Sequence, residues 1–312
     1  MNQYRYINQM SINSEVELET RLLKIKHIAL DMDGTIYNGN TLFHFTLPFL
    51  AKMKELGIKY SFLTNNPTKS IDSYLEHLAS MGINATREEM YSSAQATIDY
   101  LNKNFPEIKR LFILGTPSMI NEFEKDGFIS TSDDPDDVPQ GVVVSFDTSL
   151  TYPRLCRAAW WIEQQLLYIA TNPDKVCPTD MSVTLVDCGS ICSSLEQATG
   201  RKPDIVIGKP DPRMLEGIQQ HYQLESSQIA IIGDRIYTDL QMAYNAKALG
   251  VLVLTGETSL NVAENSVPRP DIIVDDLGEF GEMLYKLYND RLCINNIKKQ
   301  IQNLECNRYE IL

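Results

Sequence analysis

Four short stretches of the chain carry side chains that could do chemistry together. They read DMDGT at 31–35, LTNNP at 63–67, GKPDP at 208–212 and GDRIYTD at 233–239. Their reactive groups are four carboxylates, a lysine, a hydroxyl and an amide: Asp31, Asp33, Asp234, Asp239, Lys209, Thr64 and Asn65. Carboxylates as close in sequence as Asp31 and Asp33 repel each other unless a cation or a proton intervenes.

This set of groups suits the transfer of a phosphoryl group. Mg²⁺ binds through a few carboxylates together with substrate phosphate, and it would remove the repulsion between the carboxylates. A lysine and a hydroxyl then neutralise the remaining phosphate charge. One carboxylate is left to attack phosphorus and form an aspartyl-phosphate. A second can protonate the leaving oxygen and later activate water.

Strands must position these stretches, because each stretch follows a short apolar run. Eight runs are predicted to be strands: 26–31, 59–64, 110–115, 141–146, 166–171, 204–208, 228–234 and 249–254. Helical patterns lie between them, so we predict an α/β protein whose core is a Rossmann-like, doubly wound parallel sheet. In such sheets ligands bind outside the carboxyl ends of the strands, where the four stretches would meet.

In this order, the four stretches resemble the four motifs of the haloacid dehalogenase superfamily of phosphotransferases. The runs TNNPTKS, VVVSFDTSLTYPRL, YIATNPD and ATGRKPDIVIGKPDP are similar to the branch with a type IIA cap. That branch includes the NagD-like, p-nitrophenylphosphate and phosphoglycolate phosphatases. The resemblance covers roughly residues 25–288 and leaves both ends of the chain outside it.

The resemblance implies a role for each motif residue. Asp31 would be the nucleophile, and Asp33 the general acid/base whose main-chain carbonyl also binds Mg²⁺. Asp31 and Asp234 would complete the protein ligands of the metal, with Asp239 supporting that site. Thr64 and Asn65 would bind the phosphoryl group, and Lys209 would stabilise its charge and that of Asp31. Gly34 would let the backbone approach the phosphate closely, which a Cβ would hinder.

Residues 106–203 separate the second motif from the third and have their own β/α alternation. We expect them to form an inserted α/β cap domain, with a discontinuous catalytic core made of 1–105 and 204–312. Such a cap would close over the site and exclude bulk water. By resemblance to the family's specificity loop, Asn172 and Asp174 are candidates for substrate binding. A plain Asx turn is the alternative for both.

The composition restricts the class of protein. The net charge of −13 argues against a general nucleic-acid binder. The sequence has neither an apolar run near the roughly 20 residues of a membrane span nor the layout of a signal peptide, so we expect a cytoplasmic protein. Its six cysteines are sparse and are expected to be free thiols. Cys188 and Cys192 have the spacing of half a zinc site without a second pair.

Several residues have an ordinary structural interpretation. Met32 is predicted to be a core residue, the loop 131–141 to be solvated, and 287–312 to form a polar helix on the body. Asp239 could simply cap the helix that follows it. Six further residues are expected to pack or to lie at the surface: His27, His44, His77, His221, Trp160 and Trp161.

The residues and the resemblance together predict a Mg²⁺-dependent phosphatase for small phosphorylated metabolites. A phosphotransferase or phosphomutase on the same scaffold is one alternative, although the sequence shows no acceptor site. A catalytically weak binding or regulatory protein is another. The substrate is left open among sugar phosphates, phosphoglycolate and nucleoside monophosphates. The oligomeric state is also left open, with a homodimer through the cap as the arrangement that the resemblance suggests.

Overall fold

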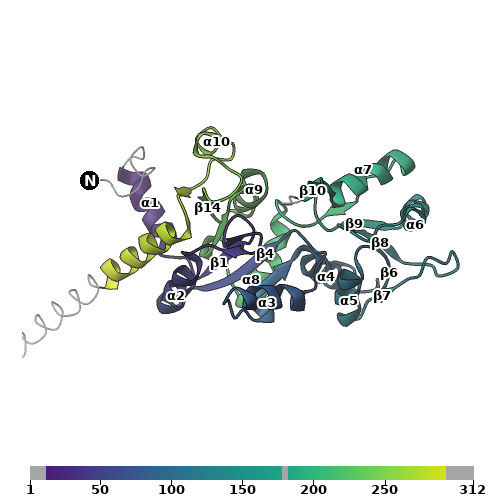
Figure 1. Ribbon diagram of the computed structural model, residues 1–312, viewed down its shortest axis with the longest axis horizontal. Helices are drawn as coiled ribbons and strands as arrows, with labels where there is room; N and C mark the ends of the chain where they lie inside the picture. Colours follow the sequence, from purple (N-terminus) through teal and green to yellow (C-terminus); the bar gives the residue numbers. More distant parts are fainter. Residues whose placement is uncertain (1–11, 178–181, 293–312) are drawn as a thin grey trace, which may run out of the picture.

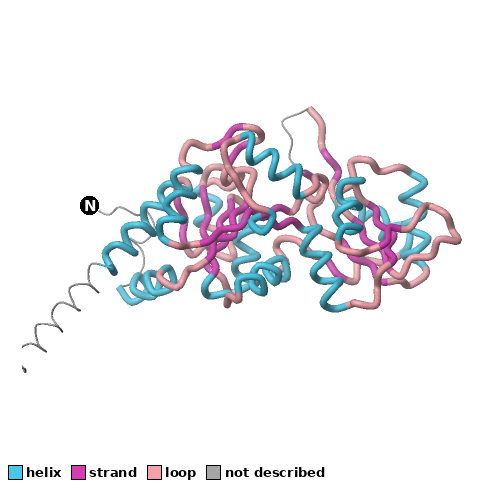
Figure 2. Tube along the Cα trace, turned by 90° about the horizontal axis from the view of Figure 1, so that it is seen from below, coloured by secondary structure: helices cyan, strands magenta, loops and turns pink. Residues whose placement is uncertain are grey.

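Two parallel sheets, each flanked by helices, lie side by side along the long axis of the molecule (Figures 1 and 2). The computed structural model describes residues 12–177 and 182–292. This arrangement confirms the predicted α/β class with parallel sheets. No helix within those ranges is both long and apolar enough to cross a lipid bilayer.

The first sheet has six parallel strands, and three of them lead directly into the stretches DMDGT, LTNNP and GDRIYTD. Its strands in spatial order are β15 (Ile272–Val274), β14 (Leu249–Val253), β13 (Ile229–Gly233), β1 (His27–Asp31), β4 (Lys59–Thr64) and β5 (Met90–Ser92). The helices of this part are α1 (Ile12–Leu22), α2 (Thr46–Leu56), α3 (Ile71–Ser80), α4 (Ser93–Asn104), α8 (Glu216–Tyr222), α9 (Gln241–Ala246) and α10 (Leu260–Glu264). A further helical segment covers 277–292.

The second sheet has five parallel strands and lies at the other end of the molecule (Figure 1). Its strands in spatial order are β12 (Ile205–Val206), β9 (Leu167–Ala170), β8 (Gly141–Val144), β6 (Arg110–Leu114) and β7 (Ile129–Ser130). Its helices are α5 (Pro117–Lys125), α6 (Tyr152–Glu163) and α7 (Cys188–Thr199). We call residues 110–206 the insert and the remaining described residues the core. The domain boundaries at 105/106 and 203/204 stay a prediction, and β12 lies just beyond the second.

Two short antiparallel hairpins complete the fold. One joins β2 (Tyr37–Asn38) and β3 (Thr41–Leu42) directly after the DMDGT stretch. The other joins β10 (Val176–Cys177) and β11 (Leu185–Val186) within the insert.

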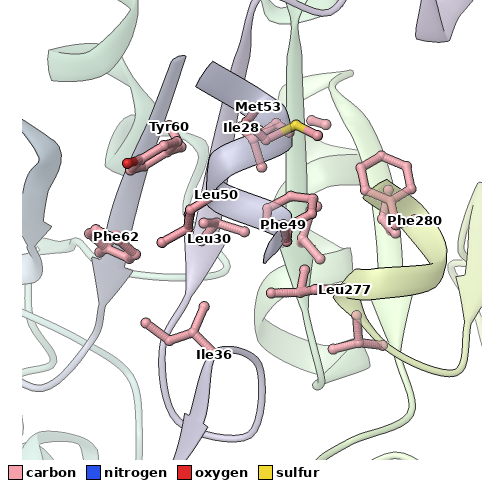
Figure 3. Close-up of a cluster of buried hydrophobic side chains, with 14 of the residues drawn as sticks. Ile28, Leu30, Ile36, Phe49, Leu50, Met53, Tyr60, Phe62, Leu277 and Phe280 are labelled. Atoms are coloured by element: carbon pink, nitrogen blue, oxygen red, sulfur yellow. The ribbon is translucent and has the colours of Figure 1, made fainter. Parts of the chain in front are cut away.

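Strand β1 is buried on both faces, because its side chains alternate between two apolar layers. Ile28 and Leu30 face α2, where they pack with Phe49 and Met53 (Figure 3). Ala29 faces the opposite layer. This burial holds the end of β1, and therefore Asp31, in a fixed place.

The layer that receives Ala29 extends into the insert. It joins Leu63 and Ile231 of the core to Ile113 of β6 and Val143 of β8 in one cluster of buried side chains. A separate cluster fills the other face of the second sheet, beneath α6 and α7. The insert therefore has one apolar face of its own and shares the other with the core.

The residues given an ordinary interpretation fall mostly as expected. Met32 is buried in the core, and the loop 131–141 is largely exposed. Trp161 is buried with Ala158 and Ile162 on the face of α6 that packs on the sheet, whereas Trp160 lies off that face and is half exposed. From residue 293 onward, the predicted C-terminal helix lies outside the described residues.

Candidate active site

Three neighbouring parallel strands bring the motifs to one edge of the core sheet. β1 lies between β13 and β4, with Leu30 beside Ile232 and Asp31 beside Leu63. The stretches after these strands therefore meet at their carboxyl ends. The GKPDP stretch arrives from the insert, directly after β12. All four stretches come together as the sequence predicts, and contacts among their side chains tie them to one another.

Three carboxylates form a cluster at the edge of the core sheet, and the ammonium group of Lys209 contacts two of them. One oxygen of each of Asp31, Asp234 and Asp239 lies within 4.8 Å of the others. Lys209 Nζ donates to Asp31 Oδ1, and to Asp239 Oδ1 at 2.7 Å. Asp234, Asp239 and Lys209 are each at most 3% exposed. The cluster thus holds more negative than positive charge inside the protein.

Asp239 reaches this cluster from a short π-helical turn, Ile236–Leu240. Such turns are rare and occur frequently at functional sites. The turn brings the Asp239 carboxylate so close to Gly233 that a Cβ there would lie 2.3 Å from Asp239 Cγ. Asp239 is therefore a member of the cluster and does not cap α9, which begins at Gln241.

Burial and the neighbouring charges shift the pKa values of the residues in the cluster. Burial raises the pKa of Asp31 to about 7; Lys209 opposes this shift, while Asp239 and Asp234 add to it. Burial raises the pKa of Asp234 to about 6, again with a contribution from Asp239. Burial alone would lower the pKa of Lys209, but the carboxylates of Asp239 and Asp31 raise it. Lys209 therefore stays protonated, and additional positive charge would favour the ionised carboxylates.

The cluster has the features of a divalent cation site. Asp234 Oδ2 accepts a hydrogen bond from Glu257 N at 2.7 Å. The buried Asp234 Oδ1 has no hydrogen-bond partner and makes only an ion pair with Arg235 Nε at 4.0 Å. A buried carboxylate oxygen without a hydrogen bond is rare and calls for a ligand. Hard oxygen donors from several carboxylates are what Mg²⁺ and Ca²⁺ bind. Among the described residues, these three carboxylates form the one group of such side chains close enough to share an ion.

Asp33 lies apart from this group. Its side chain is exposed in the loop before β2, where Oδ1 accepts a hydrogen bond from Gly39 N at 3.0 Å. Gly34, the next residue, has a φ of +84°, and a Cβ there would lie 2.7 Å from Asp234 Oδ2. Of the four predicted metal residues, the structure gathers three carboxylates and leaves that of Asp33 facing solvent.

The predicted phosphate-binding side chains both make contacts within the protein. Thr64 Oγ1 accepts a hydrogen bond from Asn66 N at 3.0 Å. The amide of Asn65 contacts the main chain of Lys209 through both of its ends and also the carboxylate of Asp174. Thr64 and Asn65 therefore lie beside Lys209, at the edge of the sheet that carries Asp31.

The two predicted substrate-binding residues of the insert differ in exposure. Asn172 is fully buried, and its amide contacts Asp187 and Thr171. Asp174 is half-buried and accepts the hydrogen bond from Asn65 at 2.9 Å. The structure therefore brings Asp174 to the core motifs, and it places Asn172 behind Asp174.

Two further contacts near Asp234 did not emerge from the sequence. Gly256 is so close that a Cβ would lie 2.0 Å from Asp234 Oδ2. The side chain of Arg235 forms an ion pair with Glu257, with Nε 3.1 Å from Oε2. The stretch TGET at 255–258 directly follows the predicted strand 249–254. Ligands bind beyond the carboxyl ends of parallel strands, so its position in the sequence was a signal that could have found it.

Comparison with known proteins places the chain in a family. A profile of haloacid dehalogenase-like hydrolases matches residues 28–129, and a second HAD-hydrolase-like profile matches 206–280. The ribonucleotide monophosphatase NagD of Escherichia coli is 29% identical over 257 residues, which are 82% of this chain and 98% of NagD.

Solved structures agree with this placement. The 4-nitrophenylphosphatase of Thermotoga maritima is 36% identical, with a TM-score of 0.79 over 84% of this chain and 98% of that chain. The glycerol phosphate phosphatase of Mycobacterium tuberculosis, solved in complex with magnesium, is 29% identical. Its TM-score is 0.76, over 83% of this chain and 77% of that chain. The chain is therefore a phosphatase of the haloacid dehalogenase superfamily, in its NagD-like branch with a type IIA cap.

Proposed function

We propose that the protein is a Mg²⁺-dependent hydrolase of small phosphate monoesters that works through an aspartyl-phosphate on Asp31. The observation that carries this proposal is the bridge of Lys209 between Asp31 and Asp239, beside the buried Asp234 oxygen that accepts no hydrogen bond. A nucleophilic carboxylate needs neighbouring positive charge to stay ionised and to accept the approach of an anionic phosphate.

Asp31, Asp234 and the main-chain carbonyl of Asp33 would hold the metal, with Asp239 supporting the site. When bound, Mg²⁺ would neutralise charge on the carboxylates and on the phosphoryl oxygens. The choice of Mg²⁺ is supported by the relative solved with magnesium, and by the preference of this ion for carboxylate and phosphate oxygens.

The chain's own residues would carry both chemical steps. In the first, a bond forms between Asp31 Oδ and phosphorus, the ester P–O bond breaks, and Asp33 donates its proton to the leaving oxygen. In the second, Asp33 removes a proton from water, whose oxygen attacks phosphorus and releases phosphate from Asp31. Lys209, Thr64 and the backbone at Gly34 and Asn65 would bind the phosphoryl oxygens. The solvent-facing position of Asp33 suits proton exchange.

The insert would act as the cap that selects the substrate, with the predicted boundaries 106–203 between core segments 1–105 and 204–312. Asn172 and Asp174 stay the predicted selecting residues, and a homodimer through the cap and a cytoplasmic location stay predictions. Small metabolites fit this proposal, because a cap leaves little room for a phosphoprotein. The named relatives act on ribonucleotides, glycerol phosphate and 4-nitrophenyl phosphate, so they leave the ester open.

The test is hydrolysis of a panel of phosphate monoesters by the purified protein, with Mg²⁺ and with EDTA. The panel contains 4-nitrophenyl phosphate, glycerol phosphate, phosphoglycolate, a sugar phosphate and a ribonucleotide. We expect phosphate release with Mg²⁺, none with EDTA, and a loss of at least about 10³-fold in kcat for Asp31→Asn. Turnover that survives EDTA or the Asp31→Asn change, or its absence in the folded wild type with Mg²⁺, would contradict the proposal.

A further inference from the structure

A chain of hydrogen bonds runs from the insert to the main chain of Lys209, whose side chain carries the ammonium group. Asp174 Oδ2 accepts from Asn65 Nδ2 at 2.9 Å. Asn65 is in turn bonded to the main chain of Lys209, whose Nζ contacts Asp31. The chain connects a residue predicted to choose the substrate with the proposed nucleophile.

The middle link holds Lys209 at two points. Asn65 Oδ1 accepts from Lys209 N at 2.7 Å, and Asn65 Nδ2 donates to Lys209 O at 2.9 Å. The amide thus fixes the peptide plane on each side of the Lys209 Cα. The neighbouring Gly208 has a φ of +80°, and a Cβ there would lie 3.0 Å from Asn65 Oδ1. This close packing leaves little freedom in where the lysine side chain begins.

The far end of the chain is anchored inside the insert. Asn172 Nδ2 contacts Asp174 Oδ2 at 3.4 Å and Asp187 Oδ1 at 3.0 Å. The main-chain oxygen of Asp174 accepts from Gly189 N at 2.7 Å. Gly189 lies at the start of α7, where a Cβ would be 2.2 Å from Pro173 O. Asp174 is therefore held in place by the insert, and its position relative to Asn65 depends on the position of α7.

We propose that Asn65 is a positioning residue through which Asp174 of the insert sets Lys209 on Asp31. Catalysis then depends on how the insert is docked, since losing the Asp174 contact frees the Asn65 amide to turn away from Lys209. This inference rests on the proposed function, because its effect is read as turnover. It differs from the predicted substrate-binding role of Asp174, which would act on the leaving group of the ester.

The experiment compares Asn65→Leu, Asp174→Ala and their double variant with the wild type on the same ester panel. Misplacing Lys209 should lower kcat by about 10- to 100-fold for every ester, with KM within about threefold. Because Asp174 acts through Asn65, the double variant should be no slower than Asn65→Leu alone. Asp174→Asn keeps an oxygen that can accept the hydrogen bond, so it should recover most of the lost kcat.

Glu163→Ala is the matched control, since it removes an exposed carboxylate from the end of α6 and should leave kcat unchanged. Thermal unfolding of each variant shows that a loss of kcat occurs in folded protein. A loss for Asp174→Ala that differs widely between esters would overturn the inference and show direct substrate contact. Losses that multiply in the double variant would also overturn it. Absence of turnover by the folded wild type would instead overturn the proposed function, and the inference with it.

Discussion

Glycine residues shape the acid cluster at atomic distances. A Cβ at Gly34, Gly233 or Gly256 would lie less than 3.0 Å from a carboxylate atom of Asp234 or Asp239. At Gly233 and Gly256 a larger residue is excluded by lack of space alone, whereas Gly34 also has a positive φ that favours glycine. The motifs predicted the need for a glycine only at Gly34. The role of Gly256 depends on how β14 lies beside β13, which residue types alone do not reveal.

Gly256→Ala should weaken metal binding more than it weakens the fold. The added Cβ would lie 2.0 Å from Asp234 Oδ2, so the carboxylate must turn away from the cluster. Displacing a metal ligand or its supporting contact typically lowers affinity by about 10- to 100-fold. Titration calorimetry with Mg²⁺, in the absence of any ester, measures this loss directly.

Gly250→Ala is the matched control, in strand β14, which leads into the turn that carries Gly256. Its Cβ would meet side-chain atoms of Leu240 and Ala243 at 3.0 and 3.1 Å, away from Asp234. It should lower the free energy of unfolding without changing Mg²⁺ affinity. Equal Mg²⁺ affinity in Gly256→Ala and the wild type would show that Asp234 is not a ligand.

At the scale of elements, the strands that could be predicted are those with long apolar runs. All eight predicted runs contain a strand, and in all but β12 most residues of the strand are buried, which leaves a continuous apolar signal. β5 and β15 have three residues each and were not among the predicted runs, because neither lies in a longer apolar stretch. The meeting of the four motifs was also predictable, since parallel strands end at one edge. The pairing of Asn65 with Asp174 was not, because it depends on the docking of two separate sheets.

Strand β1 begins with a histidine whose burial makes the fold sensitive to pH. His27 is fully buried, with Nε2 2.9 Å from Ser61 Oγ and its ring against Tyr222. Burial, with smaller effects of Lys59 and His221, lowers the pKa of His27 from 6.5 to about 3. As the pH falls below 6.5, the unfolded chain takes up this proton and the folded protein does not. The free energy of unfolding therefore decreases toward pH 3.

His27→Gln should remove this dependence, since glutamine does not titrate and can still bond to Ser61. Between pH 7 and pH 5, the wild type should lose about 2 kcal/mol relative to the variant, at most about 1.4 kcal/mol per pH unit below 6.5. Urea unfolding of both proteins at each pH gives the difference. The raised pKa values of Asp31 and Asp234 instead increase the free energy of unfolding as the pH falls. Both proteins share this effect, so it cancels in the difference between them. A constant difference across this range would show that His27 takes up its proton in the folded protein at the same pH as in the unfolded chain.

At the scale of the whole molecule, the shared apolar cluster joins the insert to the core. Side chains of β1, β4 and β13 pack in the same cluster as those of β6, β8 and β9. Helix α4 of the core and α5 of the insert both contribute to it. Separating the two sheets would expose this surface to water, at a cost of about 25 cal/mol for each Å² of apolar area. The two sheets should therefore unfold together.

The chain offers a direct test of this coupling, because its two tryptophans, Trp160 and Trp161, both lie in α6 of the insert. Their fluorescence reports the insert alone, whereas far-UV circular dichroism reports both sheets. We expect the two signals to give one coincident transition in urea.

Ile113→Ala in the shared cluster should shift both transitions to lower urea concentration together, with a loss of about 2–5 kcal/mol in the free energy of unfolding. Ile162→Ala removes a side chain from the insert's own cluster. It should also shift both transitions together if the insert and the core unfold as one unit. A fluorescence transition that moves alone would mean that the insert unfolds as an independent domain, and that its contact with the core is too weak to transmit the position of Asp174.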